Sequence, residues 1–215
     1  MTTNRSFKSF ILKTSVLFSF LGFLMIYWAA TNAYNTAVKN TAVEASKQLA
    51  NATFNSMFQI MKQGWSREQV ESFLGNVKTN SSSESYRIQI YRSKKVEQVF
   101  GKIEQPDFDP FIQLVAQKKA HADQIDGKQL RFALPLIADD ACLSCHVNAV
   151  NGDLLGIIEI NQDLTSLMKD AQSGLIKNLL YLFPVPFVLS IFVIFFLNRR
   201  INQSVEHLEG NIEKV

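Results

Sequence analysis

The chain has 215 residues, a formal net charge of +3 and 47% hydrophobic residues. Its mean hydropathy of +0.03 lies above the balance that is usual for a soluble domain, so membrane segments are the first feature to look for. Lys and Arg nearly balance Asp and Glu between residues 31 and 173, which argues against a nucleic-acid-binding surface.

Two apolar segments are each long enough to cross about 30 Å of hydrocarbon as a helix. The first is residues 14–30, which contain no charge and end near Tyr27 and Trp28, an aromatic pair typical of a membrane interface. The second is residues 177–197, where two prolines predict a kink that membrane helices tolerate. We therefore expect two transmembrane helices.

The charged flanks predict the orientation of these two helices. Arg5, Lys8 and Lys13 precede the first segment, and Arg199 and Arg200 follow the second. By the positive-inside rule, residues 1–13 and 198–215 are cytoplasmic and residues 31–173 are exported. In a bacterium this arrangement predicts an inner-membrane protein whose central domain lies in the periplasm. A cleaved signal peptide, with a weak cleavage site at Thr31–Ala33, is the alternative for the first segment.

The exported segment begins with helical patterning. Apolar or small residues recur at three- and four-residue steps from Tyr34 to Met61, which predicts a long helix that continues the first membrane span and ends near Gly64. The sequence Ser66–Gln69 has the spacing of a capping box, which predicts a short second helix carrying Val70, Phe73 and Leu74. A loop is expected at Asn80–Glu84.

After this loop the patterning becomes that of strands. Tyr86–Arg92 alternates in hydrophobicity, and Val96–Phe100 is expected to pair with it. A helical stretch near Phe111–Lys119 follows. Asp126-Gly127 predicts a hairpin between Ala122–Ile125 and Lys128–Leu134. Gly156–Ile160 is expected to form the last strand. A helix capped by Asp163 then leads to the second membrane segment. This order predicts an α+β domain with an antiparallel sheet.

An apolar stripe follows the second membrane segment. Its members are spaced by four, three, four and three residues, and they are Ile201, Val205, Leu208, Ile212 and Val215. This spacing fits the a/d seam of a coiled coil, although a surface helix with one apolar face has the same pattern.

Both cysteines of the chain lie in the sequence A-C-L-S-C-H at residues 141–146. A pair of thiols at this spacing suits a redox dithiol, part of a zinc site, or covalent attachment of c-type haem. Zinc needs about four ligands, and the exported segment adds only the distant His121. A thioredoxin-like dithiol needs a lowered thiol pKa, whereas Asp139 and Asp140 oppose thiolate formation.

Haem attachment accounts for every part of this motif. Cys142 and Cys145, three residues apart on one helical turn, reach the two vinyl groups of one covalent haem c, and His146 becomes the axial iron ligand. The attachment takes place on the exported side of bacterial membranes, where the topology prediction independently puts the motif. The candidates for a sixth ligand are Met61, which we favour, and Met57, Met168 and His121.

The whole layout resembles the periplasmic c-type haem sensor domains of bacterial chemotaxis receptors, histidine kinases and diguanylate cyclases. The resemblance covers nearly all of the chain and rests on F-x-x-M-x-x-x-M-x-x-G at Phe54–Gly64, L-R-F-A-L-P-L, C-L-S-C-H, and G-x-x-x-G-x-I-x-I at Gly152–Ile160. Of these motifs only C-x-x-C-H is highly specific.

This resemblance implies a PAS-like fold, a covalent haem on Cys142 and Cys145, His146 as proximal ligand, Met61 as distal ligand, and a homodimer. One departure from the family matters. The sequence stops at Val215, inside what looks like a HAMP-type linker, so we expect the cytoplasmic signalling output in a longer chain or in a partner.

The expected function is that of a sensor of redox state or of a small diatomic gas, which passes its signal across the lipid bilayer. Enzyme activity is not expected, because the exported segment has neither a Ser/His/Asp set nor a phosphate-binding loop. The alternative is a membrane-anchored monohaem electron carrier, for which an apolar stripe beyond the membrane would be superfluous.

Overall fold

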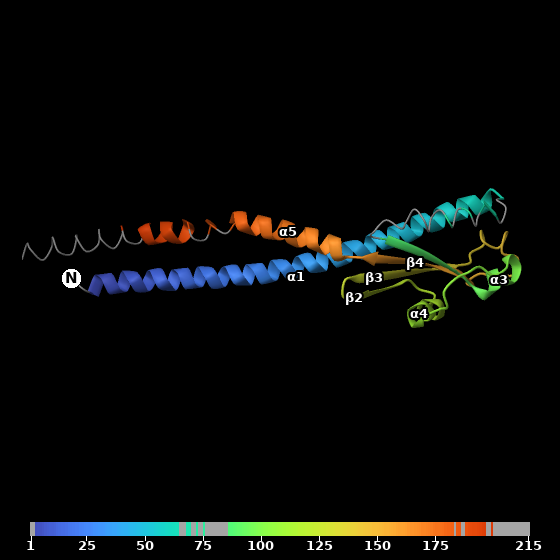
Figure 1. The fold of residues 1–215 in the computed structure, drawn as a ribbon, viewed down its shortest axis with the longest axis horizontal. Coiled ribbons are helices and arrows are strands. Elements are labelled where there is room, and N and C mark those ends of the chain that lie inside the picture. The colour runs from blue at the N-terminus through green and yellow to red at the C-terminus, as the bar shows by residue number, and fades with distance from the viewer. Residues whose placement is uncertain are drawn as a thin grey trace, which may run out of the picture. The chain divides into compact units, whose positions relative to one another are not determined.

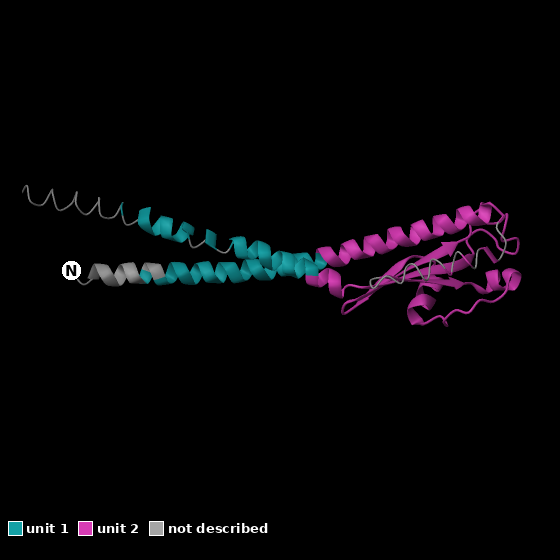
Figure 2. Ribbon diagram, turned by 45° about the horizontal axis from the view of Figure 1, so that its top comes forward, with its two compact units in different colours: residues 1–36, 170–215 teal, residues 37–169 magenta. Residues whose placement is uncertain are grey.

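The structure is a computed structural model that describes residues 3–64, 68–69, 72, 75, 86–182, 184–185, 188–196 and 199. The chain divides into two compact units, which Figure 2 colours separately. Unit 1 comprises Met1–Thr36 and Asp170–Val215, and unit 2 comprises Ala37–Lys169. The helix α1 (Thr3–Lys62) contributes to both units, and it confirms the prediction of one helix that runs on from the first apolar segment.

Unit 2 contains a four-stranded antiparallel sheet in the order β1-β4-β3-β2. Its strands are β1 (Tyr86–Arg92), β2 (Ala122–Asp126), β3 (Gln129–Ile137) and β4 (Leu154–Asp163). The central strands β3 and β4 are the most apolar, as expected for strands with neighbours on both sides. With α1 this sheet confirms the predicted α+β class with an antiparallel sheet and a long N-terminal helix.

One face of the sheet packs against the end of α1 that belongs to unit 2, as Figure 1 shows. The shared core contains Ala50 and Met57 from the helix and, from the strands, Ile88, Phe132, Leu136, Ile158 and Ile160. Tyr86 and Ile90 pack on the same core as Ile88, which confirms the alternation predicted for this strand.

The opposite face of the sheet is covered by α4 (Pro110–Lys118). Asp109 caps this helix by accepting a hydrogen bond from the Ile112 N–H at 2.9 Å, and Pro110 occupies the first turn, where its missing N–H costs nothing. Beside the cap, Arg131 contacts both Asp109 and the buried Glu159. The bounds of α4 confirm the helix predicted near Phe111–Lys119.

The prediction that Val96–Phe100 forms a strand beside β1 is wrong. These residues belong to the helix α3 (Lys94–Phe100), and β1 pairs with β4 instead. Ser93 caps the helix by accepting from the Val96 N–H, and Gly101 ends it at φ 79°. The apolar residues Val96, Val99 and Phe100 are spaced three and four apart, which fits a helix as well as a strand, and the two caps favour the helix.

The hairpin and the exit helix are confirmed. Gly127 takes a positive φ of 57° between β2 and β3, which glycine adopts readily because it has no Cβ atom. The helix α5 (Thr165–Leu182) follows β4 directly, and the Asp163 carboxylate accepts from the Thr165 N–H at 2.8 Å. The capping box Ser66–Gln69 and the loop Asn80–Glu84 lie wholly or largely outside the described residues.

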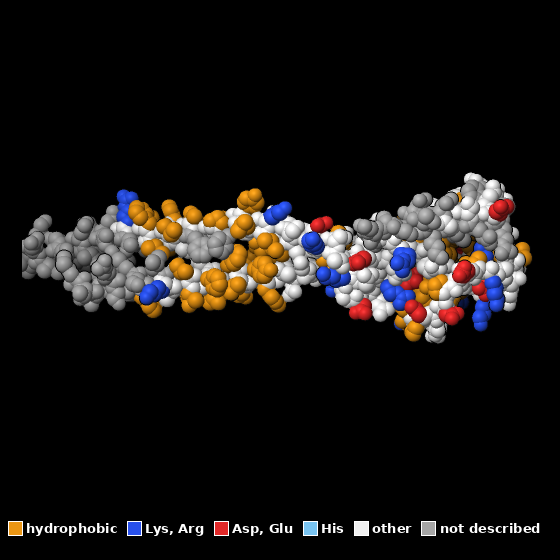
Figure 3. All heavy atoms as spheres, in the orientation of Figure 1, with side chains coloured by type: hydrophobic (Ala, Val, Ile, Leu, Met, Phe, Trp, Pro, Cys, Tyr) orange, Lys and Arg blue, Asp and Glu red, His pale blue; other side chains and the backbone are white. Residues whose placement is uncertain are grey.

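Unit 1 consists of the first part of α1, most of α5 and the described helical residues between 184 and 199. The hydroxyl oxygens of Ser19 and Ser190 lie 3.0 Å apart and join its two chain segments. Most large apolar side chains of this unit are exposed, and Figure 3 shows them as orange surface over both segments. So much exposed apolar surface is typical of a region that lies against lipid or against a partner.

Only one helix among the described residues is long and apolar enough to cross a membrane, and it lies within α1 at Lys13–Lys62. A signal sequence near the N-terminus would meet the same criterion. The second expected span, residues 177–197, is not one continuous described helix, because positions 183, 186, 187 and 197 are outside the described set. The apolar stripe from Ile201 to Val215 also lies outside it.

Candidate functional site

A cavity of about 510 Å³ lies in unit 2 between the end of α1, α3, the sheet and the cysteine motif. Most of its wall is apolar. From α1 and the residues after it, the wall takes Phe54, Met57, Phe58, Met61, Lys62 and Gly64. The remaining wall residues are Tyr91, Arg92, Val96, Phe100, Leu136, Ala141, Cys142, Cys145, His146, Leu155 and Gly156. Ligand sites are commonly apolar cavities of about 300–1,000 Å³.

The cysteine motif forms one hydrogen-bonded turn after β3. The Asp139 carboxylate accepts from the Cys142 N–H at 3.1 Å. The Cys142 carbonyl then accepts from the N–H groups of Cys145, at 3.2 Å, and His146, at 3.0 Å. Because these bonds close one helical turn, all three functional side chains of the motif reach the same cavity, as the sequence predicts.

The two thiols have different surroundings. Both cysteines are free, but Cys142 is buried and Cys145 is exposed. Burial raises the pKa of the Cys142 thiol, and the Asp139 carboxylate beside it opposes deprotonation further. A dithiol oxidoreductase instead needs an attacking thiol with a lowered pKa, so Cys142 does not have the environment of such a nucleophile.

The imidazole of His146 is half-buried beside the cavity. Its Nδ1 atom is buried and has no hydrogen-bond partner among the described residues. The Phe100 ring contacts the imidazole edge to face, with centroids 5.2 Å apart. Burial lowers the pKa of His146 and therefore favours the neutral imidazole, which is the form that binds metals.

Of the four sixth-ligand candidates, the structure brings two to the cavity. Met57 and Met61, four residues apart on one face of α1, both line it. Met57 also belongs to the core beneath α1, whereas Met61 only packs against the edge of that core. Met168 lies in another core cluster with Leu130 and Leu164, and His121 packs against the Phe132 ring outside the cavity.

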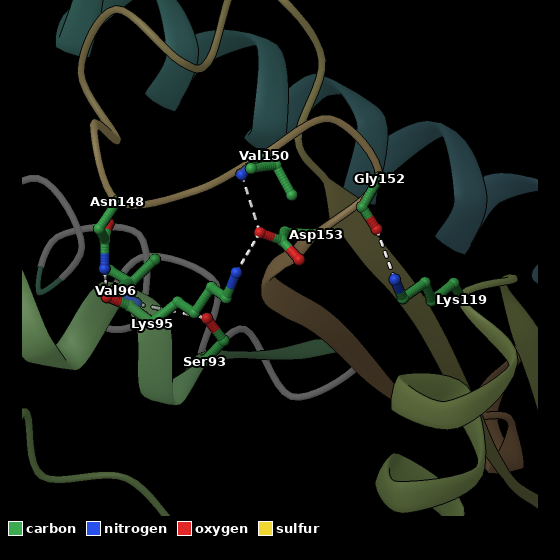
Figure 4. Close-up of polar contacts among 8 residues, drawn as sticks. All are labelled: Ser93, Lys95, Val96, Lys119, Asn148, Val150, Gly152 and Asp153. Carbon is green, nitrogen blue, oxygen red and sulfur yellow. Dashed lines mark hydrogen bonds and ion pairs between the residues drawn. The ribbon is translucent and has the colours of Figure 1, made fainter.

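The loop after the motif is tied to α3 and to the end of α4, as Figure 4 shows. Asp153 forms an ion pair with Lys95 and accepts from the Val150 N–H at 2.8 Å. The Asn148 side chain donates to the Lys95 carbonyl at 2.8 Å, and Lys119 donates to the Gly152 carbonyl. These contacts hold the loop between His146 and β4 in one arrangement and lower the pKa of Asp153, chiefly through Lys95.

Gly156 lets β4 pass close to β1 at the cavity wall. A Cβ atom at this position would lie 2.6 Å from the Tyr91 carbonyl oxygen. At that distance the two atoms clash, so any other residue here would force the backbone to move. The sequence motif G-x-x-x-G-x-I-x-I contains this glycine. The need for glycine at this position becomes clear only from the register of the sheet, in which Gly156 lies opposite Arg92.

Sequence reasoning did not assign several of the wall residues to the site. Phe54 and Phe58 share the helical spacing of Met57 and Met61, so the periodicity of α1 contained a signal for them. For Arg92 and Phe100 the sequence contained no such signal, because these residues reach the cavity only after β1 and α3 pack beside the cysteine motif.

No cluster of three or more His, Cys, Asp or Glu side chains that could hold a metal ion is present in the described parts of the chain. The four-ligand zinc alternative therefore has no assembled site there. In the comparisons with known proteins, the chain matches no family model and no curated protein sequence.

Proposed function

We propose that this chain is a membrane-bound c-type haem sensor, which detects redox state or a small diatomic gas in the periplasm of a bacterium and passes the signal across the inner membrane. One observation carries the proposal. Both cysteines, His146 and the two methionines of α1 line a single apolar cavity, although they come from segments about 80 residues apart in the sequence.

The donor set of the cavity fits one covalent haem. Cys142 and Cys145 would hold it through thioethers, which form when each S–H adds across a vinyl C=C bond, so that sulfur bonds to one carbon and the hydrogen goes to the other. His146 would bind the iron as the proximal ligand, and its unpartnered buried nitrogen suits such a site. Haem iron supplies reversible one-electron chemistry and a site for diatomic gases.

Met61 is the proposed distal ligand, with Met57 as the alternative. Both thioethers line the cavity, but Met57 is needed in the core beneath α1, whereas Met61 lies at its edge. Thioether ligation raises the reduction potential of haem iron. A Met61 side chain that leaves the iron on a redox change or on gas binding would alter what α1 contacts at this end.

Chain connectivity supports the link from site to membrane. Met61 lies on the helix that contains the first apolar segment, and the loop after His146 leads through β4 directly into α5. Switching a two-state receptor from 1:99 to 99:1 needs about 5.5 kcal/mol of differential affinity. Gain or loss of an iron ligand in each subunit of a proposed homodimer would supply part of this difference.

The wider proposal includes a PAS-like relationship for unit 2, transmembrane helices at residues 14–30 and 177–197, and a cytoplasmic output in the same chain or in a partner. The antiparallel sheet with helices on both faces supports the first part. The exposed apolar residues of both segments support the second.

The first experiment is an optical spectrum of the purified full chain, oxidised and reduced, with and without carbon monoxide. The wild-type protein should have a six-coordinate low-spin haem, and Met61→Ala should convert it to a five-coordinate or water-bound form. Met168→Ala is the control, because Met168 is a buried methionine that lies outside the cavity. Identical spectra for the Met61 variant and the wild type would exclude Met61 as ligand.

A second experiment separates a sensor from an electron carrier. Ser19 and Ser190 are in hydrogen-bond contact, so Ser19→Cys with Ser190→Cys should form a disulfide under mild oxidation in nanodiscs. In a sensor the crosslinking rate should differ between the carbon monoxide-bound and the ligand-free reduced protein, and Met61→Ala should remove that difference. An equal rate in both states would favour the electron carrier.

A further inference from the structure

We infer that Arg92 and Lys62 form a subsite for paired carboxylates in the wall of this cavity, which receives the two propionate groups of the haem. The inference rests on the proposed haem function and adds to it a cationic subsite that governs the reduction potential. Neither residue stood out from the sequence alone.

The charge of the cavity wall is one-sided. Arg92 and Lys62 are its two permanently cationic side chains, and no Asp or Glu is found among the wall residues that the structure describes. In mostly apolar pockets, a few placed polar groups fix the orientation of the ligand. A wall with two cations and no carboxylate is complementary to a ligand that brings two negative charges.

Arg92 is held in place at the end of β1. Gln105 clamps its backbone from both sides, accepting from the Arg92 N–H at 2.7 Å and donating to its carbonyl at 3.2 Å. The guanidinium also donates to the Gly101 carbonyl at 3.4 Å. With five N–H donors in a planar fork, a guanidinium can keep such a bond and still bind a carboxylate.

The register of the sheet gives the Arg92 side chain room. Its partner across β4 is Gly156, and directly opposed residues share one face of a sheet. Because Gly156 has no side chain and also lines the cavity, nothing from this position competes with the guanidinium. Gly156 therefore serves the subsite as well as the close approach of the two strands.

Lys62 provides the second cation at the end of α1. Its ammonium lies 5.2 Å from the centre of the Phe58 ring, which also lines the cavity. The side chain follows directly after Met61, so a ligand bound through Met61 lies within reach of a flexible cation.

A porphyrin matches this division of the cavity. It carries two vinyl groups for the thiols and two carboxylates for the cations, so one molecule satisfies both parts of the wall. Carboxylate pairing with a guanidinium is among the stronger charge-assisted hydrogen bonds. The subsite would therefore hold the propionates ionised and would keep positive charge near the iron.

The test is a redox titration of the haem-loaded full chain carrying Arg92→Leu. Removal of a cation favours the oxidised iron, so the ratio of reduced to oxidised protein at a fixed ambient potential should fall about tenfold, which is about 59 mV for one electron. A propionate without its partner also has a raised pKa, so the potential of the variant should rise as the pH falls from 8 to 5 more steeply than in the wild type.

Three further variants make the result specific. Arg92→Lys should keep a potential near that of the wild type, because it keeps the charge. Lys62→Met should lower the potential less than Arg92→Leu, because Lys62 is more exposed. Arg87→Leu is the matched control, since it removes the same charge from an exposed position on the same strand outside the cavity wall, and it should leave the potential unchanged.

Two outcomes would overturn the inference. One is equal potentials and pH slopes for Arg92→Leu and Arg87→Leu. The second applies if the Arg92→Leu variant takes up no haem: an unchanged reduction potential in Lys62→Met would then overturn the inference. A wild-type chain that takes up no haem would instead refute the proposed function itself, so the two failures are distinguishable.

Discussion

The two units of this chain bury their apolar residues in opposite ways. In unit 2 the large apolar side chains meet inside, and Phe132 at the centre of the sheet is 0% exposed. In unit 1 most of them are exposed, and Phe18 is 74% exposed. The first arrangement is what water imposes, and the second is tolerated only where lipid or a partner covers the surface. The comparison shows that hydrophobicity alone does not specify a core.

The largest expected effect comes from removing the same side chain in each unit. Phe132→Ala leaves a cavity between α1 and β3 and should lower the free energy of unfolding by about 3–5 kcal/mol. Phe18→Ala should change it by less than about 1 kcal/mol, because its ring is already exposed. Urea unfolding of both full-length variants in detergent measures the difference. Equal losses would show that Phe18 is buried in a protein core.

The next effect concerns charge inside unit 2. The Glu159 side chain is 3% exposed and pairs with Arg131, while Tyr91 donates to its other oxygen at 2.9 Å. Arg131→Met keeps much of the packing but leaves the carboxylate without its cation, so the free energy of unfolding should fall by about 3 kcal/mol. The same unfolding assay measures it.

Glu159→Gln provides the control for the buried pair. This substitution replaces the carboxylate by a neutral amide whose oxygen can still accept from Tyr91, so combining Glu159→Gln with Arg131→Met should recover part of the loss. A double variant as unstable as the sum of the two single variants would contradict this account.

A smaller effect is expected for the polar contact in unit 1. Under the proposed membrane topology, Ser19→Ala or Ser190→Ala should weaken association of the two segments by about 0.6 kcal/mol, which is typical of a hydrogen bond between membrane helices. Denaturation of the full chain in mixed micelles, followed by helical circular dichroism, is the measurement. Thr31→Ala is the control, because the Thr31 hydroxyl donates to the Tyr27 carbonyl within its own helix, so its loss should leave the association unchanged.

The smallest effect is a pH dependence in unit 2. Burial tends to raise the pKa of Asp109, but the Ile112 N–H and the Arg131 guanidinium together hold this pKa below its usual range. A lowered pKa in the folded state stabilises the fold above the unfolded pKa of about 4 and loses that contribution as the pH falls further. Because the Asp109 side chain is 41% exposed, the loss should stay below about 0.5 kcal/mol.

Thermal unfolding between pH 6 and 3 checks this prediction. Asp109→Asn should have a flatter profile than the wild type over the acidic part of the range, because it cannot take up the proton. A profile as steep as that of the wild type would assign the acid sensitivity to other carboxylates, such as Asp153.

Local patterns in the sequence predicted much of unit 2. Alternation in Tyr86–Arg92, the Asp126-Gly127 turn and the periodicity of α1 are signals within one element, and each was confirmed. Val96–Phe100 was misassigned because four or five residues do not distinguish a strand from a helix. Burial of Ala133 and Ile157 beneath α4 required knowledge of the second layer, which no single element contains.

The site divides in the same way. Cys142, Cys145 and His146 were predicted because their chemistry depends on spacing along the chain, and the methionines were predicted because they share a helix face. Arg92, Phe100 and Lys62 reach the cavity only after β1, α3 and α1 have packed, so their part in it depends on tertiary structure.

The central claim is that two sulfur atoms and one imidazole of this chain hold a haem. Its most direct test is the intact mass and absorption spectrum of the full chain, expressed with a cytochrome c maturation system and then denatured. We predict one haem that stays attached in denaturant and is lost in the variant carrying Cys142→Ser and Cys145→Ser. A colourless wild-type protein with two free thiols would contradict the account.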